Sequence, residues 1–213
     1  MKAAGPRLPI LVVAPTSLLK NWEQEVAHHV ATPGLGHLVR LFGSATGARR
    51  LSGTQGKDTD NGEAKLDLAD LSRAIERNAG HLTWVLTTYT TLTNYHHSLG
   101  RIPFAAVVFD EIQNIKNAGT LAAHAARSVN AQFRIGLTGT PIENSTQDLW
   151  AVMDALWCSG ALGSLTEFRR RYGTADAGNM AELHARVFRP QEGAPPLALR
   201  RLKETVARDL PAK

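Results

Sequence analysis

The sequence contains a single cysteine and no long apolar run. Because Cys158 has no partner within the chain, an internal disulfide and a thiolate metal cluster are both excluded. This favours a reducing compartment, in which Cys158 is a small apolar residue. No run approaches the roughly 18 apolar residues that a membrane span needs. The apolar segment Ile10–Ala14 near the N-terminus is too short for a signal peptide and ends at Pro15. We expect a cytoplasmic protein without a membrane partner.

Three nucleotide-binding or hydrolase motifs are also missing. The sequence has neither the G-x-S-x-G of a nucleophile elbow nor the G-x-G-x-x-G of a dinucleotide site. The pair Gly56-Lys57 resembles the end of a phosphate loop, G-x-x-x-x-G-K-[ST], but Leu51 replaces the first glycine and Asp58 follows the lysine. Esterase and dinucleotide-binding functions therefore lack support, and these 213 residues contain no phosphate loop.

Composition is that of an ordinary soluble domain. Hydrophobic residues make up 43% of the chain and charged residues 20%, which argues against wholesale disorder. The formal net charge is +5, and the segment 166–213 holds ten basic and six acidic residues, a difference of +4. An excess this small is a weak argument for nucleic acid.

Short apolar runs alternate with stretches of helical spacing along the first three quarters of the chain. The runs predict strands at Ile10–Ala14, His37–Phe42, Trp84–Thr88, Ala105–Phe109 and Phe133–Leu137. Helices are predicted at about 18–30, 66–75, 89–99, 118–129 and 146–157, and segment 43–62 is predicted to be a loop or insertion. This alternation predicts an α/β fold, a parallel sheet flanked by helices. We assign residues 1–158 to that domain and 159–213 to a C-terminal helical appendage, with loops at 173–178 and 189–196.

Two adjacent carboxylates, Asp110 and Glu111, follow the strand Ala105–Phe109. Ligands bind at the carboxyl ends of parallel strands, and such a pair suits a magnesium ion and an attacking water. Asp110 would hold the ion through water, and Glu111 would orient and deprotonate the attacking water. Gln113 would contact the γ-phosphate or relay its presence to the next strand. The same acids could instead cap the next helix. Taken alone, the pattern leaves both interpretations open.

Three further turns carry hydroxyl groups at strand ends. Thr138-Gly139-Thr140-Pro141 forms a compact polar turn that could switch partners between a nucleotide and a nucleic acid. At Pro15-Thr16 and at Thr88, hydroxyls and free helix amides could bind a backbone phosphate. Each turn could equally be a simple helix cap. The Trp22 side chain is predicted to be core rather than a base-stacking platform.

Five segments in order resemble the first motor lobe of Swi/Snf-type helicase-like ATPases, members of the DEAD/DEAH-box superfamily. They are ILVVAPTSLLKNWEQEV, WVLTTYTTL, VVFDEIQNIKN, IGLTGTPIENSTQDLWAVMDAL and LRRLKETVARDLP. The match covers nearly the whole chain and is closest to bacterial members. It implies a RecA-like lobe that couples ATP hydrolysis to movement along double-stranded DNA in the bacterial cytoplasm, associated with the nucleoid.

The resemblance also implies roles for individual residues. Asp110 and Glu111 match the magnesium-binding and water-activating acids, and Gln113 stands where that motif ends in Gln or His. Ile112 replaces a more usual alanine. The coupling motif is matched by Thr138, Gly139 and Thr140, the DNA-backbone motif by Pro15 and Thr16, and the basic segment leading to a second lobe by Arg200, Arg201 and Lys203.

Two departures from the family limit what this chain is expected to do. The family's phosphate loop precedes the strand that begins here at Ile10, and only nine residues lie before it. The second RecA-like lobe would follow Lys213. Because that loop and lobe bind the phosphates and close the cleft, we expect ATP and magnesium to bind tightly only in a complete protein, and this chain alone to be inactive. Two alternatives stay open, a non-catalytic module that binds DNA backbone and a decayed gene fragment.

Overall fold

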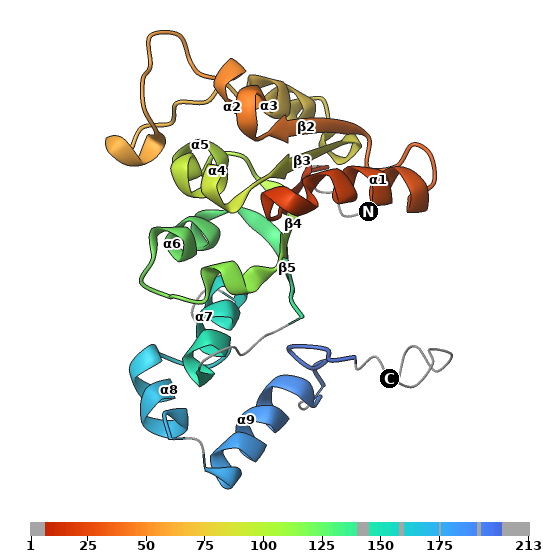
Figure 1. The fold of residues 1–213 in the computed structure, drawn as a ribbon. Helices are drawn as coiled ribbons and strands as arrows, with labels where there is room; N and C mark the ends of the chain where they lie inside the picture. The colour runs from red at the N-terminus through yellow and green to blue at the C-terminus, as the bar shows by residue number, and fades with distance from the viewer. Residues whose placement is uncertain (1–6, 140–144, 158–159, 175, 191–192, 202–213) are drawn as a thin grey trace. The chain divides into compact units, whose positions relative to one another are not determined.

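A parallel sheet of five strands organises the first part of the chain (Figure 1). The structure is a computed structural model that describes residues 7–139, 145–157, 160–174, 176–190 and 193–201. The sheet order is β2-β3-β1-β4-β5, and every pairing is parallel. The strands are β1 (Ile10–Val13), β2 (His37–Leu41), β3 (Thr83–Thr87), β4 (Phe104–Asp110) and β5 (Ala131–Leu137). The predicted α/β class with a parallel sheet is confirmed, and each predicted strand lies within two residues of its observed position.

Helices connect these strands and cover the sheet. They are α1 (Leu19–His29), α2 (Gly43–Ala48), α3 (Ala69–Glu76), α4 (Tyr89–Asn94), α5 (His96–Gly100), α6 (Leu121–Ser128) and α7 (Thr146–Trp157). Single 3₁₀ turns lie at η1 (Thr16–Leu18), η2 (Asp58–Asp60), η3 (Gly80–Leu82) and η4 (Ile112–Ile115). The crossovers from strand to parallel strand require such covering elements, because parallel neighbours cannot be joined by a hairpin.

The two faces of the sheet have separate apolar cores. On one face, Leu11, Val85 and Val107 pack in a large cluster with side chains from the helices α3 to α7. On the other face, α1 covers a smaller cluster that includes Val12 and Leu86. Successive side chains of a strand point to opposite faces, which explains this alternation and the nearly continuous apolar runs of strands covered on both sides. Figure 1 shows α1 on one side of the strands and α4 to α6 on the other.

The segment 43–62, predicted to be a loop or insertion, contains two short helical elements. Its first residues form α2, and η2 follows further on. Asp58 at the start of η2 is fully buried, and its carboxylate accepts hydrogen bonds from the backbone amides of Lys65 at 2.9 Å and Ser98 at 2.6 Å. A buried carboxylate needs such partners, so Asp58 fixes the segment against α5. The predicted helix 89–99 is likewise two helices, α4 and α5, separated at Tyr95.

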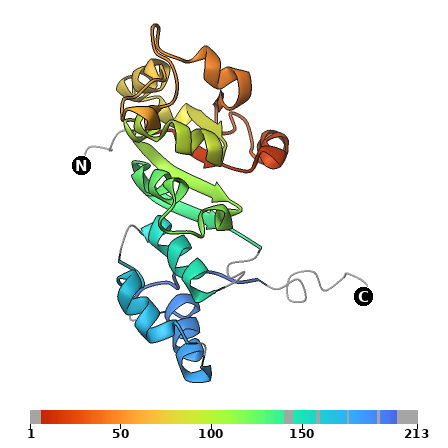
Figure 2. The ribbon, with the colours of Figure 1, turned by 60° about the vertical axis from the view of Figure 1, so that its left-hand side comes forward.

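Two compact units divide the chain, residues 1–164 and 165–213. The second contains α8 (Leu165–Tyr172) and α9 (Ala177–Phe188), which lie side by side (Figure 1, Figure 2). Tyr172 donates to Glu182 at 2.8 Å, and Asp176 caps α9 by accepting from the Asn179 amide. Gly178, predicted to lie in a loop, is therefore inside the first turn of α9. Within the described residues, no helix is long and apolar enough to cross a membrane.

Candidate functional site

The turns after four strands meet at one edge of the sheet. Because β1, β3, β4 and β5 are parallel and adjacent in register, their carboxyl ends lie together. This edge receives Thr16 after β1, Thr88 after β3, Asp110 at the end of β4 and Thr138 after β5. Ligands of open parallel sheets bind at this edge, so the fold brings these predicted site residues to one region.

Asp110 is the last residue of β4 and faces α1. Side chains two residues apart on a strand point to the same face, and Val108 packs against the apolar cluster that α1 covers. Its carboxylate accepts two hydrogen bonds, one at Oδ2 from the Trp22 indole Nε1–H at 2.8 Å and one at Oδ1 from the Glu111 amide at 3.0 Å. Both oxygens are therefore held in place, and each keeps a lone pair for another partner.

Glu111 has a left-handed backbone conformation, with φ 51° and ψ 53°. Such a conformation is uncommon for a residue with a side chain, and strain of this kind gathers at functional sites. Two neighbours support it. The Glu111 amide donates to Asp110, and the Asn114 side-chain amide donates to the Glu111 carbonyl at 2.7 Å. The turn holds the Glu111 carboxylate half-buried beside the end of β4.

Gln113 joins the turn after β4 to the turn after β5. Its Nε2 donates to the Glu111 carboxylate at 2.6 Å, and its Oε1 accepts from the Thr138 hydroxyl at 2.7 Å. A chain of side-chain hydrogen bonds thus runs from Glu111 to Thr138. These hydrogen bonds join Glu111, Gln113 and Thr138, three of the residues predicted for nucleotide chemistry and coupling. They connect the end of β4 to the end of β5.

Tyr89 holds the backbone of the same strand end. Its hydroxyl donates to the Asp110 carbonyl at 2.8 Å, and its ring stacks on Phe109 with centroids 6.5 Å apart. Burial raises the pKa of Tyr89 well above its usual range, and the nearby carboxylates of Asp110 and Glu111 raise it further. The hydroxyl therefore stays protonated and remains a donor.

The two predicted backbone-phosphate turns differ. Thr88 is buried and caps α4, because its hydroxyl accepts from the Thr91 amide at 3.1 Å and bonds the Thr91 hydroxyl at 3.0 Å. Thr16 and Ser17 are exposed, and Pro15 at the cap position of η1 provides no side-chain hydrogen bond. The sequence allowed either a helix cap or a phosphate contact at each of these turns. The structure shows a side-chain cap at Thr88.

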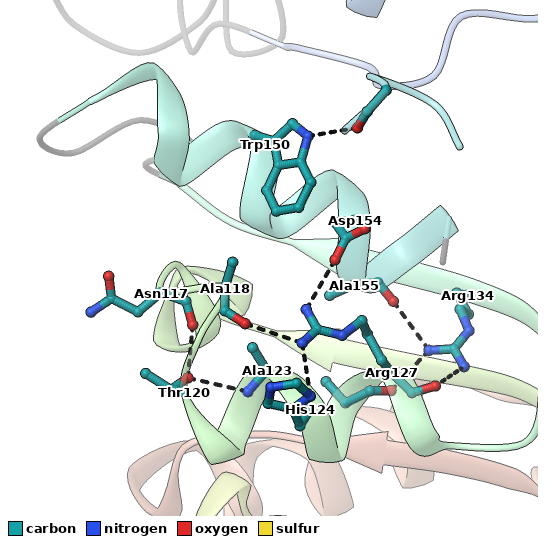
Figure 3. Close-up of polar contacts among 12 residues, drawn as sticks. Asn117, Ala118, Thr120, Ala123, His124, Arg127, Arg134, Trp150, Asp154 and Ala155 are labelled. Atoms are coloured by element: carbon teal, nitrogen blue, oxygen red, sulfur yellow. Dashed lines mark hydrogen bonds and ion pairs between the residues drawn. The ribbon is translucent and has the colours of Figure 1, made fainter. Parts of the chain in front are cut away.

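The strand β5 is anchored by Arg134 (Figure 3). Its guanidinium donates to the carbonyls of Ala126 at 2.9 Å and Arg127 at 3.1 Å near the end of α6, and to that of Val129 just after it. It also donates to Ala155 of α7 at 3.1 Å. The last carbonyls of a helix lack the usual partner four residues further on; here the Ala126 carbonyl accepts from both the Val129 amide and Arg134. Arg134 therefore fixes the strand that carries Thr138 against two helices.

A second arginine and a glycine complete this packing. Arg127 bonds Asp154 of α7 at 2.9 Å and the Ala118 carbonyl at 3.1 Å. At Gly136, a Cβ would lie 2.8 Å from Ile112 Cδ1 and 2.9 Å from Leu156 Cδ1, so a larger residue there would make these two side chains of η4 and α7 shift.

The remaining predicted residues lie at the margins of the described structure. Gly139 is exposed, and a Cβ there would meet nothing within 4 Å. Thr140 lies outside the described residues, as does Lys203. Arg200 and Arg201 are exposed in the second unit.

The carboxylates at the end of β4 fit a magnesium ion. Mg²⁺ takes oxygen ligands, keeps several waters and commonly uses one or two carboxylates beside substrate phosphates. Asp110 offers such an oxygen with a remaining lone pair. In the part of the chain that is described, no group of three or more His, Cys, Asp or Glu residues could hold a metal alone. A magnesium ion at this strand end would need further ligands besides Asp110, such as water and phosphate oxygens.

Sequence reasoning missed two residues of this site, Trp22 and Tyr89. Trp22 does pack against the α1 cluster as predicted, yet its indole also bonds Asp110. The available signal was chemical: a half-buried tryptophan or tyrosine usually finds a hydrogen-bond partner for its polar atom.

Comparisons with known proteins agree with this architecture. A model of the SNF2-related domain matches residues 1–213. The Zorya protein ZorD of Escherichia coli is 36% identical over 206 residues, 96% of this chain and 18% of that protein. A putative ATP-dependent helicase/translocase of Bacillus subtilis, YwqA, is 33% identical over 209 residues, 97% of this chain and 20% of that protein. This chain thus spans about a fifth of the length of these curated relatives.

Solved structures similar to this chain are also SWI2/SNF2 ATPase cores. The Sulfolobus solfataricus SWI2/SNF2 ATPase core domain is 31% identical and superposes with a TM-score of 0.63, covering 96% of this chain and 35% of that one. The core of the same organism in complex with dsDNA superposes with a TM-score of 0.61 at 31% identity, covering 84% of this chain and 32% of that one. The sheet described here therefore matches the RecA-like lobe of an ATPase core.

Proposed function

Because this chain belongs to the SNF2-related family of helicase-like ATPases, we propose that it is part of a DNA-dependent ATPase that moves along double-stranded DNA. The observation that carries the proposal is the set of side-chain hydrogen bonds from Glu111 through Gln113 to Thr138, beside Asp110 at the strand ends. It joins the residues that hydrolysis needs to the turn that follows the next strand. A structural relative bound to dsDNA supports duplex DNA as the partner.

Each residue has a chemical task in this proposal. A bound magnesium ion would neutralise charge that develops on the phosphates. Asp110 holds that ion through water, with its carboxylate oriented by two hydrogen bonds. Glu111 orients the attacking water and accepts its proton, as a general base. Gln113 contacts the γ-phosphate and reports its presence to Thr138 through their hydrogen bond.

The DNA-facing part of the proposal uses the turn after β1. The exposed Thr16 hydroxyl, next to Pro15, donates to a backbone phosphate, and Thr88 supports the neighbouring turn as a cap. Thr138 and Gly139, continued by Thr140, couple the state of the nucleotide to the grip on DNA. Such contacts to the backbone carry no sequence information, so we propose movement on DNA of any sequence, in the nucleoid of a bacterial cell.

ATP hydrolysis on this proposal needs two further parts, a phosphate loop and a second RecA-like lobe. The 213 residues contain no G-x-x-x-x-G-K-[ST]. We therefore propose that the chain alone is inactive, and that ATP and magnesium bind tightly only when those parts are supplied.

A chimera tests the catalytic roles. This chain replaces the aligned segment of the Sulfolobus solfataricus core, which then supplies whatever the chain does not contain. We expect ATP hydrolysis stimulated by duplex DNA. Glu111→Gln should lower turnover at least ~100-fold, the low end for loss of a general base, with ATP binding retained. Glu76→Gln, at an exposed position of α3, is the matched control and should leave turnover unchanged. Turnover of the Glu111→Gln chimera near that of its parent would refute the assignment.

The isolated chain provides a second test, of DNA binding. We expect weak duplex binding, independent of sequence and falling as salt rises, because contacts to phosphates release counterions. It should be accompanied by no ATP hydrolysis. Duplex binding that does not change with salt would contradict the proposed backbone contacts.

A further inference from the structure

Trp22 connects the helix after the DNA-facing turn to the proposed magnesium ligand. It lies in the first turns of α1, which begins directly after η1, the turn that contains Thr16. Its ring packs on the cluster formed by β1 and β3 side chains, and its Nε1–H donates to Asp110 Oδ2 at 2.8 Å, 88 residues away in sequence. The ring is thus held by apolar packing while its one polar atom meets the carboxylate.

The chemistry of this donor suits a metal ligand. An indole N–H is a donor only and carries no charge. It can therefore fix the direction of a carboxylate without cancelling the negative charge that attracts a cation, as a lysine or arginine would. Partners behind a metal ligand commonly set both its orientation and its affinity for the ion.

The other described contacts of Asp110 come from its own turn or are made to its backbone. The Glu111 amide bonds Oδ1 at 3.0 Å, and Tyr89 bonds the Asp110 carbonyl at 2.8 Å. Neither contact reaches Oδ2. Among the described contacts, the Trp22 bond is the one that a distant element makes to the carboxylate itself.

We infer that Trp22 is a positioning residue of the metal site, which orients the Asp110 carboxylate toward a divalent cation through the bond to Oδ2. The inference rests on the proposed function, because it needs Asp110 to bind the ion. It assigns to the α1 helix a task in metal binding beyond its role in the core.

Manganese binding to the 213-residue chain tests this, with Mn²⁺ as a paramagnetic probe in place of Mg²⁺. NMR signals near a bound Mn²⁺ broaden. We expect Mn²⁺ to bind weakly to the chain alone, which paramagnetic broadening still detects, and to broaden the Glu111 amide and the Trp22 indole signals; Asp110→Asn should abolish this. Trp22→Phe, which keeps an aromatic ring but removes the donor, should weaken Mn²⁺ binding at Asp110 about 10-fold, the low end for a lost partner behind a ligand.

Trp84→Phe is the matched control. Trp84 is 3% exposed in the same cluster, but it pairs with Ile10, and Ile10 in turn with Ala106, four residues before Asp110 on β4. This control removes a buried indole at the other end of the sheet from Asp110. It should therefore reduce stability and leave Mn²⁺ affinity unchanged. A Mn²⁺ affinity that falls equally in both variants would overturn the inference.

Other outcomes separate this inference from the proposed function. Broadening at Glu111 in the parent chain with the same Mn²⁺ affinity in Trp22→Phe would overturn the role of Trp22 alone. No broadening at Glu111 in the parent chain would overturn both the metal role of Asp110 and the inference that depends on it.

A measurement on the parent chain does not depend on how well the variants fold. Titration with Mg²⁺ should shift the Trp22 indole signal, because the ion draws charge from the carboxylate that this N–H bonds. The Trp84 indole signal should stay in place. A shift of the Glu111 amide on Mg²⁺ titration without one at the Trp22 indole would overturn the inference.

Discussion

The two halves of the sheet's carboxyl edge are organised differently. In the half formed by β4 and β5, side chains bond one another across strand ends, from Glu111 through Gln113 to Thr138. In the half formed by β1 and β3, Thr88 bonds only within its own turn, and Thr16 is exposed.

This difference corresponds to two physical demands. Groups that act on a reacting phosphate gain most when they are fixed before the reaction, since no reorganisation is then needed. A contact to a DNA phosphate needs a hydroxyl that solvent can reach. Under the proposed function, the β4–β5 half would serve as a preorganised site and the β1–β3 half as a surface on which DNA is bound and released.

The largest effect is expected where the β4–β5 half is anchored. Arg134→Met keeps much of the side-chain length but leaves carbonyls of α6 and α7 without their charged donor. We expect the free energy of unfolding to fall by about 3 kcal/mol, because hydrogen bonds to charged groups contribute more than neutral ones and several carbonyls lose this donor at once. Denaturant unfolding measures it.

Arg40→Met is the control for this prediction, on β2 at the opposite side of the sheet. Arg40 makes a bidentate pair with Glu23 at 2.6 and 2.8 Å, but its side chain is 50% exposed. Exposed pairs contribute about 1 kcal/mol or less. Equal losses for Arg134→Met and Arg40→Met would show that the two halves are not anchored differently.

The next largest effect is a difference in stability between variants of Thr88 and Thr16, the two threonines of the β1–β3 half. Thr88→Val removes a buried cap, so we expect a loss of about 1 kcal/mol in the free energy of unfolding. Thr16→Val, at an exposed position, should change it by less than ~0.5 kcal/mol. Duplex binding should show the reverse order, with the larger loss for Thr16→Val. Thermal melts measure the losses of stability, and binding titrations at matched salt measure the losses of duplex affinity. If the same variant lost more in both measurements, Thr88 and Thr16 would not have the separate roles of cap and DNA contact.

Strand-level features of this chain could be predicted because their signals are local. The apolar run of β4 and the acids that follow it are adjacent in sequence, so the place of Asp110 at a sheet edge follows from the pattern alone. The parallel sheet follows from the alternation of strand and helix. The helix α7 has its predicted bounds, because the period of its apolar residues is undisturbed by glycine or proline.

The contacts that complete the site depend on long-range register. Trp22 meets Asp110 only because β1 lies between β3 and β4, an order that the sequence does not state. Segment 43–62 has few apolar residues, and its order depends on the buried Asp58, a residue type that is seldom buried unless it is paired. The conformation of Glu111 has no signal in sequence at all, because glycine would be expected at a positive φ.

That conformation gives a smaller but sharper prediction within the β4–β5 half. At Glu111, with φ 51°, a glycine should be more stable than an alanine by about 1 kcal/mol, because a Cβ is disfavoured in the left-handed region. Both variants lose the same carboxylate, so their difference isolates the backbone. At Lys20, exposed in α1, the order should reverse by about 1 kcal/mol. If alanine were as stable as glycine at position 111, the turn would not be strained.

The smallest effect belongs to the ion pair that joins α1 to β2 at the margin of the β1–β3 half. The hydrogen bond from Arg40 lowers the pKa of Glu23 below its ordinary 4.5. Partial burial raises this pKa, and the positive charge of Arg40 lowers it further. A lowered carboxyl pKa stabilises the folded state above the unfolded pKa, and this contribution is lost as pH falls through the folded pKa. Between neutral pH and about 4.5, Glu23→Gln should therefore be less stable than the parent by ~0.5 kcal/mol or less, since solvent screens an exposed pair. The difference should shrink at lower pH, and at neutral pH it should also shrink in high salt. A deficit that grew on acidification would mean that this pair does not stabilise the fold, and that the β1–β3 half is held by its apolar core alone.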